Sequence, residues 1–322
     1  TLTTTEKPYL RGAGGGLAQA HPNTTHARAT PGLRRPAHGS LTKALARRRA
    51  AGPPPFPVLS CDTLPANGAT LHRLLVEFAA LRDARLAAQH DAGLAAQHDA
   101  RLDPSGDARL DSSGDAPLAG HIADALAFPS SMVDRIVPAT TDIDRARTAG
   151  ELGAGEPGRV MPEPFCQWVI EDDFPAGRPA WEEFGVTMVG DVEPFEDMKL
   201  RLLNGSHSAI AYLGLLSGHA TVDRAFADPA IRQFVDALWL EASSTLPEDA
   251  GLDTSAYTAE LAERFSNTAL AHRTAQIAND GSQKLPQRIV ASAIARLEAG
   301  ALPEHLTLVL AAWITACTAR GK

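Results

Sequence analysis

Apolar and polar positions follow two different periods along this chain, and the change between them divides it into two parts. In the first part, short apolar runs predict strands over 58–61 and 132–137, and helical spacing predicts helices over 41–51 and 141–152. Helices that alternate with short apolar strands are typical of an α/β sheet. The first 40 residues show little periodicity, so we expect a strand remnant followed by irregular chain.

The second part is mainly helical. From Pro164 onward, apolar residues recur at three- and four-residue spacing, which predicts amphipathic helices, and we expect the sheet to end before that point. The expected helices span residues 193–217, 229–244, 254–265, 286–299 and 303–319. We therefore expect an α/β plus all-α fold, with an α/β domain over 1–160 and a helical domain over 161–322.

An octapeptide repeat interrupts the first domain at about residues 83–118. Its copies read DARLAAQH, DAGLAAQH, DARLDPSG and DARLDSSG, and the partial copy DAPLAG follows them. A period of eight matches neither the coiled-coil heptad nor the solenoid repeats, and several copies contain glycine or proline, which disfavour a helix. We expect a surface insertion that is disordered at its centre.

Composition and charge narrow the possible partners. The 322 residues have a formal charge of −8, which argues against nucleic-acid binding, and we interpret the arginines at 34, 35 and 47–49 as a solvated helix end. The longest apolar stretch, 306–317, is too short and too interrupted to cross a bilayer, and the chain begins without a signal-peptide pattern. We expect neither nucleic acid nor membrane as a partner.

The cysteines give no sign of a metal or redox site. Cys61, Cys166 and Cys317 are far apart, and no CxxC pair is present. This usage fits a reducing compartment, so we expect a cytoplasmic protein without a bound metal ion.

Four polar side chains lie on one face of the predicted helix 193–217. At 100° per residue, Glu196, Lys199, Asn204 and His207 share an arc of about 140°. These residue types suit the oxidation of a secondary alcohol. A lysine with a lowered pKa accepts the hydroxyl proton, an asparagine amide donates to the developing oxyanion, and a histidine holds a neighbouring hydroxyl. A glutamate one turn before the lysine passes the proton to solvent.

A structural alternative explains the same residues. The lysine then extends its amine to solvent, the asparagine is a satisfied interior amide, and the histidine is a core residue with one backbone partner. Spacing alone favours this alternative, because a KxxxxNxxH pattern is short and common by chance. Gly205 costs the helix about 1 kcal/mol relative to alanine, which is easier to understand if another group approaches the backbone there.

Five sequence blocks point to a known family. They are VLSCDTLPANG, FPSSMVDRIVPATT, PFCQWVIEDDF, FEDMKLRLLNGSHSAIAYLG and NDGSQKLPQR. In this order they resemble the mannitol dehydrogenase family, the long-chain polyol and hexuronate dehydrogenases that include fructuronate reductases. The resemblance implies a Rossmann-like NAD domain, here partial, followed by a helical domain, and a zinc-independent mechanism with a lysine base.

The resemblance also implies residue roles. The residues that correspond to the catalytic group are Lys199 as base, Asn204 and Asn67 as oxyanion donors, and Glu196 on the proton path. The residues that correspond to substrate contacts are His207, Lys284, Asp134 and Arg288. The residues expected at the coenzyme are Val133, Asp62 and Ser131. Taken alone, Asn67 also fits a turn-forming Asn-Gly pair, and Lys284 and Arg288 also fit surface charges around a helix start.

The chain departs from the family pattern at several points. The family begins with a strand and a glycine-rich turn that holds the dinucleotide pyrophosphate, whereas RGAGGGLAQA fits no GxGxxG register and no strand precedes it. We therefore expect an N-terminal truncation that removes the adenosine half of the coenzyme site. Thr63 and Ser130 stand where the family commonly has asparagine, and Gln276 where polyol-specific members carry arginine.

The sequence thus predicts an NAD-dependent oxidoreductase, with NADP as a possible coenzyme. It acts on D-mannitol and D-fructose or on D-mannonate and D-fructuronate, as a monomer or weak homo-oligomer. The alternative is an inactive remnant that folds or associates without binding coenzyme. No YxxxK pair supports a short-chain reductase, because none of Tyr9, Tyr212 and Tyr257 is followed by lysine at the fourth position.

Overall fold

The chain forms two compact units in a computed structural model that describes residues 1, 9, 12, 15–22, 24–25, 37–62, 64–95, 117–153, 155, 158 and 160–320. Unit 1 comprises residues 1–133 and 168–192, and unit 2 comprises residues 134–167 and 193–322. The chain passes from one unit to the other three times, once within the expected first domain.

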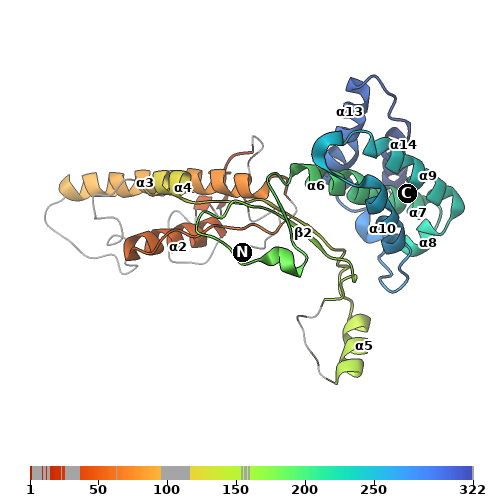
Figure 1. The fold of residues 1–322 in the computed structure, drawn as a ribbon, viewed down its shortest axis with the longest axis horizontal. Helices are drawn as coiled ribbons and strands as arrows, with labels where there is room; N and C mark the ends of the chain where they lie inside the picture. Colours follow the sequence, from red (N-terminus) through yellow and green to blue (C-terminus); the bar gives the residue numbers. More distant parts are fainter. Residues whose placement is uncertain are drawn as a thin grey trace. The chain divides into compact units, whose positions relative to one another are not determined.

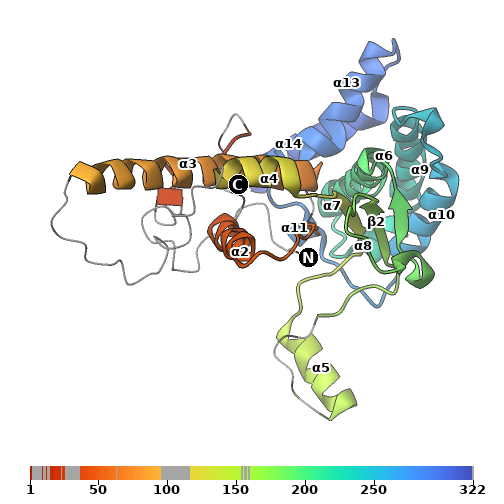
Figure 2. The same cartoon turned by 60° about the vertical axis from the view of Figure 1, so that its left-hand side comes forward.

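Three helices build most of the described part of unit 1: α2 (Ala37–Ala51), α3 (Asn67–Ala95) and α4 (Leu118–Ala125). Both α2 and α4 pack against α3 (Figure 1; Figure 2). The buried face of α3 carries Leu71, Leu74, Leu75 and Phe78. Their spacing of three and four residues places these side chains on one stripe, where they meet Leu118 and Ile122 of α4. The hydrophobic core of unit 1 lies between these helices.

The octapeptide repeat begins inside α3. Residues 83–95, which cover the first copy and five residues of the second, continue this helix. The physical reason is that the first two copies carry alanine, leucine and glutamine, which favour a helix already begun by the buried residues before them. The centre of the repeat, 96–116, lies outside the described residues.

A three-stranded sheet follows, with β1 (Ser131–Asp134), β2 (Gln167–Glu171) and β3 (Thr187–Val189) in the order β1-β2-β3. β2 and β3 are parallel, with Val169 opposite Thr187. The expectation that the sheet ends before Pro164 is therefore wrong, because two of its strands come after that residue.

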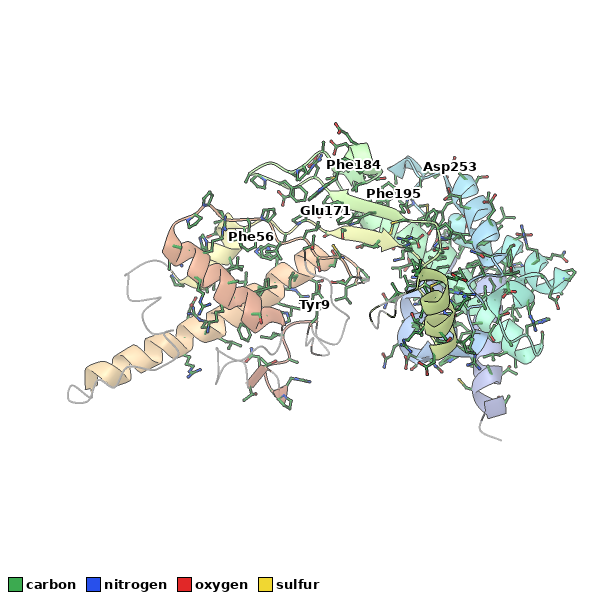
Figure 3. All side chains as sticks on the ribbon, turned by 90° about the horizontal axis from the view of Figure 1, so that it is seen from below. Tyr9, Phe56, Glu171, Phe184, Phe195 and Asp253 are labelled. Carbon is green, nitrogen blue, oxygen red and sulfur yellow. The ribbon has the colours of Figure 1, made fainter. Side chains whose placement is uncertain are left out.

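The strand expected over 58–61 is also not formed. Only Ser60 makes a bridge, and the Val58 N–H donates instead to the Ala127 carbonyl at 2.9 Å. Next to the sheet, η3 (Trp181–Phe184) brings Trp181 against the rings of Trp168 and Phe174. Phe184, at the end of η3, stays 86% exposed (Figure 3).

Unit 2 is helical apart from the residues it shares with the sheet. Its elements are α5 (Asp142–Leu152), α6 (Glu193–Met198), η4 (Lys199–Asn204), α7 (Gly205–Leu216), α8 (Val222–Phe226), α9 (Pro229–Ser243), η5 (Glu248–Ala250), α10 (Thr254–Phe265), α11 (Thr274–Ile277), α12 (Gly281–Leu285), η6 (Pro286–Val290), α13 (Ala291–Glu298) and α14 (Glu304–Arg320). Helix α7 is central: it packs against α8, α9, α11 and α14, and most of its residues are buried. Among the described helices, none combines the length and apolarity needed to cross a membrane.

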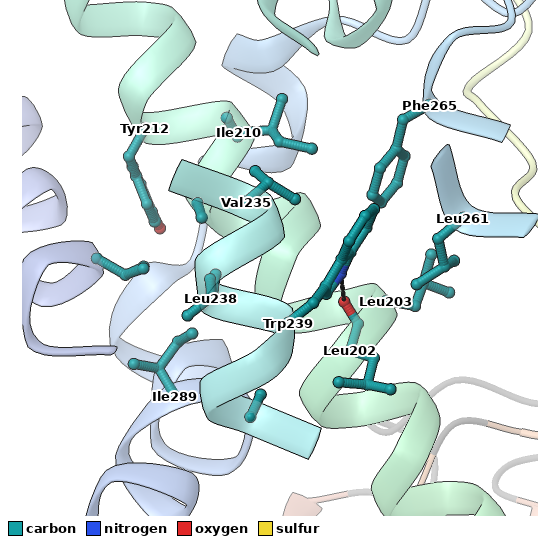
Figure 4. Close-up of a cluster of buried hydrophobic side chains, with 14 of the residues drawn as sticks. Leu202, Leu203, Ile210, Tyr212, Val235, Leu238, Trp239, Leu261, Phe265 and Ile289 are labelled. Atoms are coloured by element: carbon teal, nitrogen blue, oxygen red, sulfur yellow. Dashed lines mark hydrogen bonds between the residues drawn. The ribbon is translucent and has the colours of Figure 1, made fainter. Parts of the chain in front are cut away.

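The predicted helix 193–217 is divided by a π-helical turn. Between α6 and α7, η4 is a π-helix, in which the Gly205 N–H reaches back five residues to the Leu200 carbonyl. The Leu202 carbonyl accepts two further hydrogen bonds, from Trp239 Nε1 at 3.1 Å and from Ser206 Oγ at 2.5 Å (Figure 4). Side-chain donors therefore help to satisfy the carbonyls that the wider turn displaces.

A second π-helical turn, η6, lies beside the first. A Cβ atom on Gly205 would lie 3.1 Å from the Arg288 carbonyl oxygen, closer than side chains normally approach. This confirms that another backbone segment approaches the helix at Gly205 and explains why an alanine is not found there.

Replacing Trp239 by phenylalanine tests the support of the π turn. The phenyl ring keeps the packing against Phe265 but removes the indole donor to Leu202, so we expect a loss of about 1 kcal/mol in the free energy of unfolding. Urea denaturation measures the loss. Trp181→Phe in unit 1 is the control, and equal losses in both variants would contradict the assigned role of the indole.

Candidate active site

Lys199 opens the π turn and is partly buried. Burial lowers the pKa of its amine, while the carboxylates of Asp134 and Glu196 act in the opposite direction and the cations Arg288 and Arg264 reinforce the effect of burial. Loss of solvent thus outweighs the nearby negative charge. At a given pH, a larger fraction of this amine is therefore in the neutral, proton-accepting form than for the amine of an ordinary lysine.

The π turn changes the geometry expected for the four polar residues. In a π-helix the residue five positions ahead is the hydrogen-bonding partner, so Asn204 follows Lys199 by one such turn and lies nearer to it around the axis than an α-helix allows. His207 follows Asn204 by three residues, in α7. The turn therefore draws the candidate base and oxyanion donor toward one side of the helix.

His207 is enclosed by aromatic and cationic groups. Its ring stacks on Phe265 at 5.4 Å between centroids and meets the edge of His272 at 5.1 Å. Burial lowers the pKa of His207 well below its ordinary value, and the positive charges around it, Arg288 and Lys284 among them, add to this. His207 is therefore a neutral imidazole, and its buried Nε2 has no hydrogen-bond partner among the described residues.

Lys284 lies on α12, and Arg288 lies on η6, the element that follows α12 in the chain. The Lys284 ammonium donates to the carbonyls of Asn279 at 2.7 Å and Ile277 at 3.3 Å, and Arg288 donates to the Ser208 hydroxyl at 3.3 Å. These bonds hold the two side chains against α7 and the segment before α12. Since both cations act on His207, they share its surroundings.

Asp134 is held by Arg264, which the sequence did not single out. The guanidinium binds both Asp134 oxygens at 2.8 and 2.9 Å and both Glu163 oxygens at 2.8 and 3.0 Å. Tyr257 donates to the same Asp134 carboxylate at 2.7 Å, and the guanidinium lies 4.0 Å from the centre of the Phe165 ring. Burial opposes the charge on Arg264, but the bonds to the two carboxylates raise its pKa above the ordinary value.

A sequence signal for Arg264 exists in the spacing of α10. Tyr257, Leu261 and Phe265 lie on the buried stripe at intervals of four residues, and Arg264 occupies a position on the same stripe. A charged residue on a buried stripe requires a partner inside the protein. Glu163 gives no such signal, because it lies in the irregular segment before β2.

Asn67 lies in unit 1, at the first position of α3. Its amide nitrogen donates to the carbonyls of Ser131 at 2.8 Å and Asp62 at 3.2 Å, and its oxygen accepts the Ser131 N–H at 3.0 Å. A Cβ atom on the next residue, Gly68, would overlap the Phe128 carbonyl. The Asn-Gly pair therefore fixes α3 against the chain entering β1. The oxyanion role of Asn67 stays a prediction, in which a substrate oxygen competes with a backbone carbonyl.

Asp62 and Ser131 are bonded inside unit 1 as well. Asp62 accepts the Leu64 N–H at 2.9 Å and the hydroxyls of Ser60 and Tyr9, and Ser131 donates to the Ser60 carbonyl at 2.5 Å. Burial, with the Asp62 hydrogen bond, raises the pKa of the Tyr9 phenol above its ordinary value. These side chains hold the segment around β1, whereas Val133 presents a partly exposed aliphatic side chain near the end of that strand.

The structure thus forms two groups of expected site residues. Those in unit 2 are Asp134, Glu196, Lys199, Asn204, His207, Lys284 and Arg288. Those in unit 1 are Asp62, Asn67, Ser131 and Val133. A surface pocket of about 440 Å³ between α9 and α10, lined by Trp239 and Leu240 among others, contains none of them.

Two family models match the sequence: the mannitol dehydrogenase Rossmann domain over residues 108–183 and the mannitol dehydrogenase C-terminal domain over residues 191–321. The chain belongs to the mannitol dehydrogenase family. These matches confirm the predicted fold class, a Rossmann-like part followed by a helical C-terminal part.

Three members of the mannitol dehydrogenase family illustrate the similarity. The uncharacterized oxidoreductase YeiQ of Escherichia coli is 42% identical over 90% of this chain and 53% of its own length. The D-mannonate oxidoreductase of Escherichia coli is 40% identical over 98% of this chain and 58% of its own. The mannitol 2-dehydrogenase of Pseudomonas fluorescens, in a ternary complex with NAD and D-mannitol, is 35% identical, with a TM-score of 0.76 over 97% of this chain and 57% of that protein. The chain thus spans little more than half the length of these relatives.

The residues expected at the coenzyme lie together in β1 and in the segment bonded to it. Val133 offers an aliphatic surface for a flat ring, and the bonded side chains of Asp62 and Ser131 keep the strand that carries it in place. Within the described ranges, no group of three or more His, Cys, Asp or Glu side chains is arranged to bind a metal ion.

The neutral histidines predict acid sensitivity. Below about pH 6.5 the unfolded chain protonates His207 and the folded chain does not, so stability falls with pH by about 1.4 kcal/mol per unit until the lowered folded pKa is reached. Burial also lowers the pKa of His38 in unit 1, to about 4, and this residue adds the same acid sensitivity to the wild type and to the His207 variant. Urea denaturation at pH 7.5 and pH 5.5 should show a smaller loss for His207→Asn than for the wild type; equal losses would contradict the prediction.

Proposed function

We propose that this chain carries the catalytic apparatus of an NAD-dependent oxidoreductase that acts on the secondary alcohol of a polyol or sugar acid. The single observation that supports it most is the lowered pKa of Lys199 at the start of a π turn, in the same run of helix as the neutral His207. Membership of the mannitol dehydrogenase family adds the reaction class, since relatives carry names of mannitol and mannonate oxidoreductases.

In the proposed mechanism, the neutral amine of Lys199 accepts the hydroxyl proton of the substrate. Asn204 donates its side-chain amide to the oxygen left behind and lowers the energy of the alkoxide as it forms. Val133, Asp62 and Ser131 would hold the nicotinamide end of NAD, which would supply the hydride acceptor for this chemistry. Lys199 then returns its proton to solvent through Glu196, whose carboxylate acts on the amine from the preceding turn.

His207 orients the substrate. Its neutral ring presents a nitrogen that accepts or donates a hydrogen bond to a hydroxyl next to the reacting carbon, and the orphaned buried Nε2 is the atom that needs such a partner.

Lys199→Met is the direct test. Removal of a general base lowers turnover by about 10²–10⁴-fold, while coenzyme affinity stays close to the wild-type value because the amine has no part in it. Turnover of D-mannitol and D-mannonate with NAD is followed by NADH absorbance, and coenzyme binding by NADH fluorescence. If the variant keeps its turnover, Lys199 is not the base. If the wild-type chain does not saturate with NADH, the result supports the inactive remnant instead.

We further propose that the preferred substrate carries a carboxylate. Lys284 and Arg288 both lower the pKa of His207, so two cations lie close to the proposed substrate contact. A carboxylate group of a sugar acid gains charge-assisted hydrogen bonds there that a neutral polyol does not.

The variants Lys284→Met and Arg288→Met separate the two substrate classes. Loss of one charge-assisted bond costs about 1.5–3 kcal/mol, so we expect KM for D-mannonate to rise by about tenfold or more while KM for D-mannitol changes little. Arg296→Met on α13 is the matched control, because its guanidinium bonds to Ser244 and the Leu302 carbonyl instead. An equal rise for both substrates would contradict the carboxylate preference.

A further inference from the structure

Arg264 forms the most extensive buried ionic contact that the structure describes. Its side chain is 5% exposed, and the two carboxylates it binds, on Asp134 and Glu163, are 1% exposed each. Three charged groups removed from water stabilise a fold only when nearly every donor and acceptor is matched. Here three guanidinium nitrogens bind four carboxylate oxygens, and Tyr257 and the Ile136 N–H complete the set.

The same cluster also lies near the candidate base, because α10, which carries Arg264, packs against η4, which begins at Lys199. Asp134 raises the pKa of Lys199, and Arg264 lowers it. With two carboxylates and one guanidinium, the cluster carries one excess negative charge, which would draw a proton onto a nearby amine. A guanidinium that directs both carboxylates toward itself limits this attraction.

We propose that Arg264 is a positioning residue for Lys199: by binding Asp134 and Glu163 together, it keeps the carboxylate of Asp134 from holding the amine in its protonated form. Arg264 acts through Asp134 and touches neither substrate nor coenzyme. The proposal rests on the function proposed for Lys199 as a base and goes beyond it, because it assigns a role to a residue outside the expected site.

Four charged groups of the described residues act on Lys199, each from a different element. They are Asp134 from β1, Glu196 from α6, Arg264 from α10 and Arg288 from η6. Removal of Arg264 deletes a repelling cation and releases an attracting carboxylate, so both consequences raise the pKa of Lys199. The sign of the predicted shift is therefore the same whichever consequence dominates.

The titration of Lys199 measures the proposal without any need for turnover. The chain has five lysines, Lys7, Lys43, Lys199, Lys284 and Lys322, so a protein labelled with ¹³C at the lysine Cε gives five NMR signals. Lys199→Met assigns one of them. We expect the Lys199 signal of Arg264→Met to titrate at higher pH than in the wild type, while that of Lys43, on α2 of unit 1, stays in place.

The controls separate positioning from folding. Arg232→Met on α9 removes a surface arginine that bonds to Asp236 and should leave the Lys199 titration unchanged. Asp134→Asn in the Arg264→Met background should bring the titration back down, because it removes the released carboxylate. A purely structural role predicts lower thermal stability for Arg264→Met with no change in the titration, and that result would overturn the proposal.

A second variant guards against misfolding. Arg264→Lys keeps the positive charge but cannot bind two carboxylates side by side, so we expect an upward shift smaller than that of Arg264→Met. If the chain turns over substrate, the acid limb of the pH profile for alcohol oxidation moves upward with the titration. If no substrate is turned over, the proposed function fails, while the NMR titration still decides whether Arg264 sets the protonation of Lys199.

Discussion

A charge that leaves water must find its partners inside the protein, and the helical unit is organised around that constraint. Arg264 of α10 satisfies it for Asp134 at the end of β1 and for Glu163 in the segment before β2. A single guanidinium thereby ties three stretches of chain that have no common secondary structure. Loss of one member would leave the others buried and uncompensated, which costs several kcal/mol, so the arrangement is retained as a whole or not at all.

The two π turns, η4 and η6, also depend on groups from neighbouring elements. A π turn has weaker packing along its axis than an α-helix and is rare, so it persists only where neighbouring groups support it. Trp239 supports η4 through the Leu202 carbonyl, and the absence of a side chain on Gly205 lets η6 approach. Together they set the register of Lys199, Asn204 and His207, the residues proposed for the chemistry.

Local pattern predicts α9 and α10 closely, because the spacing of residues such as Tyr257 to Phe265 records which face is buried. The longest described helix, α3, was not predicted, although Leu71 to Phe78 have the same spacing. β2 and β3 escaped prediction because strands of five and three residues hold too few positions to reveal a period. The π turns left no trace either, since their stability comes from a tryptophan and a carbonyl on other elements.

Sequence spacing draws attention to candidate residues that share one helix but gives no pattern for contacts between distant segments. Lys199, Asn204 and His207 lie within nine consecutive positions, whereas Arg264 finds its carboxylates 130 and 101 residues away. Sequence spacing carries no information about such a contact. The bonding of Asn67 to Ser131 across 64 positions escaped prediction for the same reason.

Helix α3 continues into the octapeptide repeat, so the number of helical copies determines its length. Eight residues in α-helical form add about 12 Å of length and about 80° of rotation beyond whole turns. Among residues 67–85 of α3, whose side chains the structure describes, the last buried one is Ala79, which precedes the first repeat copy. Helical copies would therefore change the reach and facing of the distal end of α3 while the packed base of the helix keeps its place.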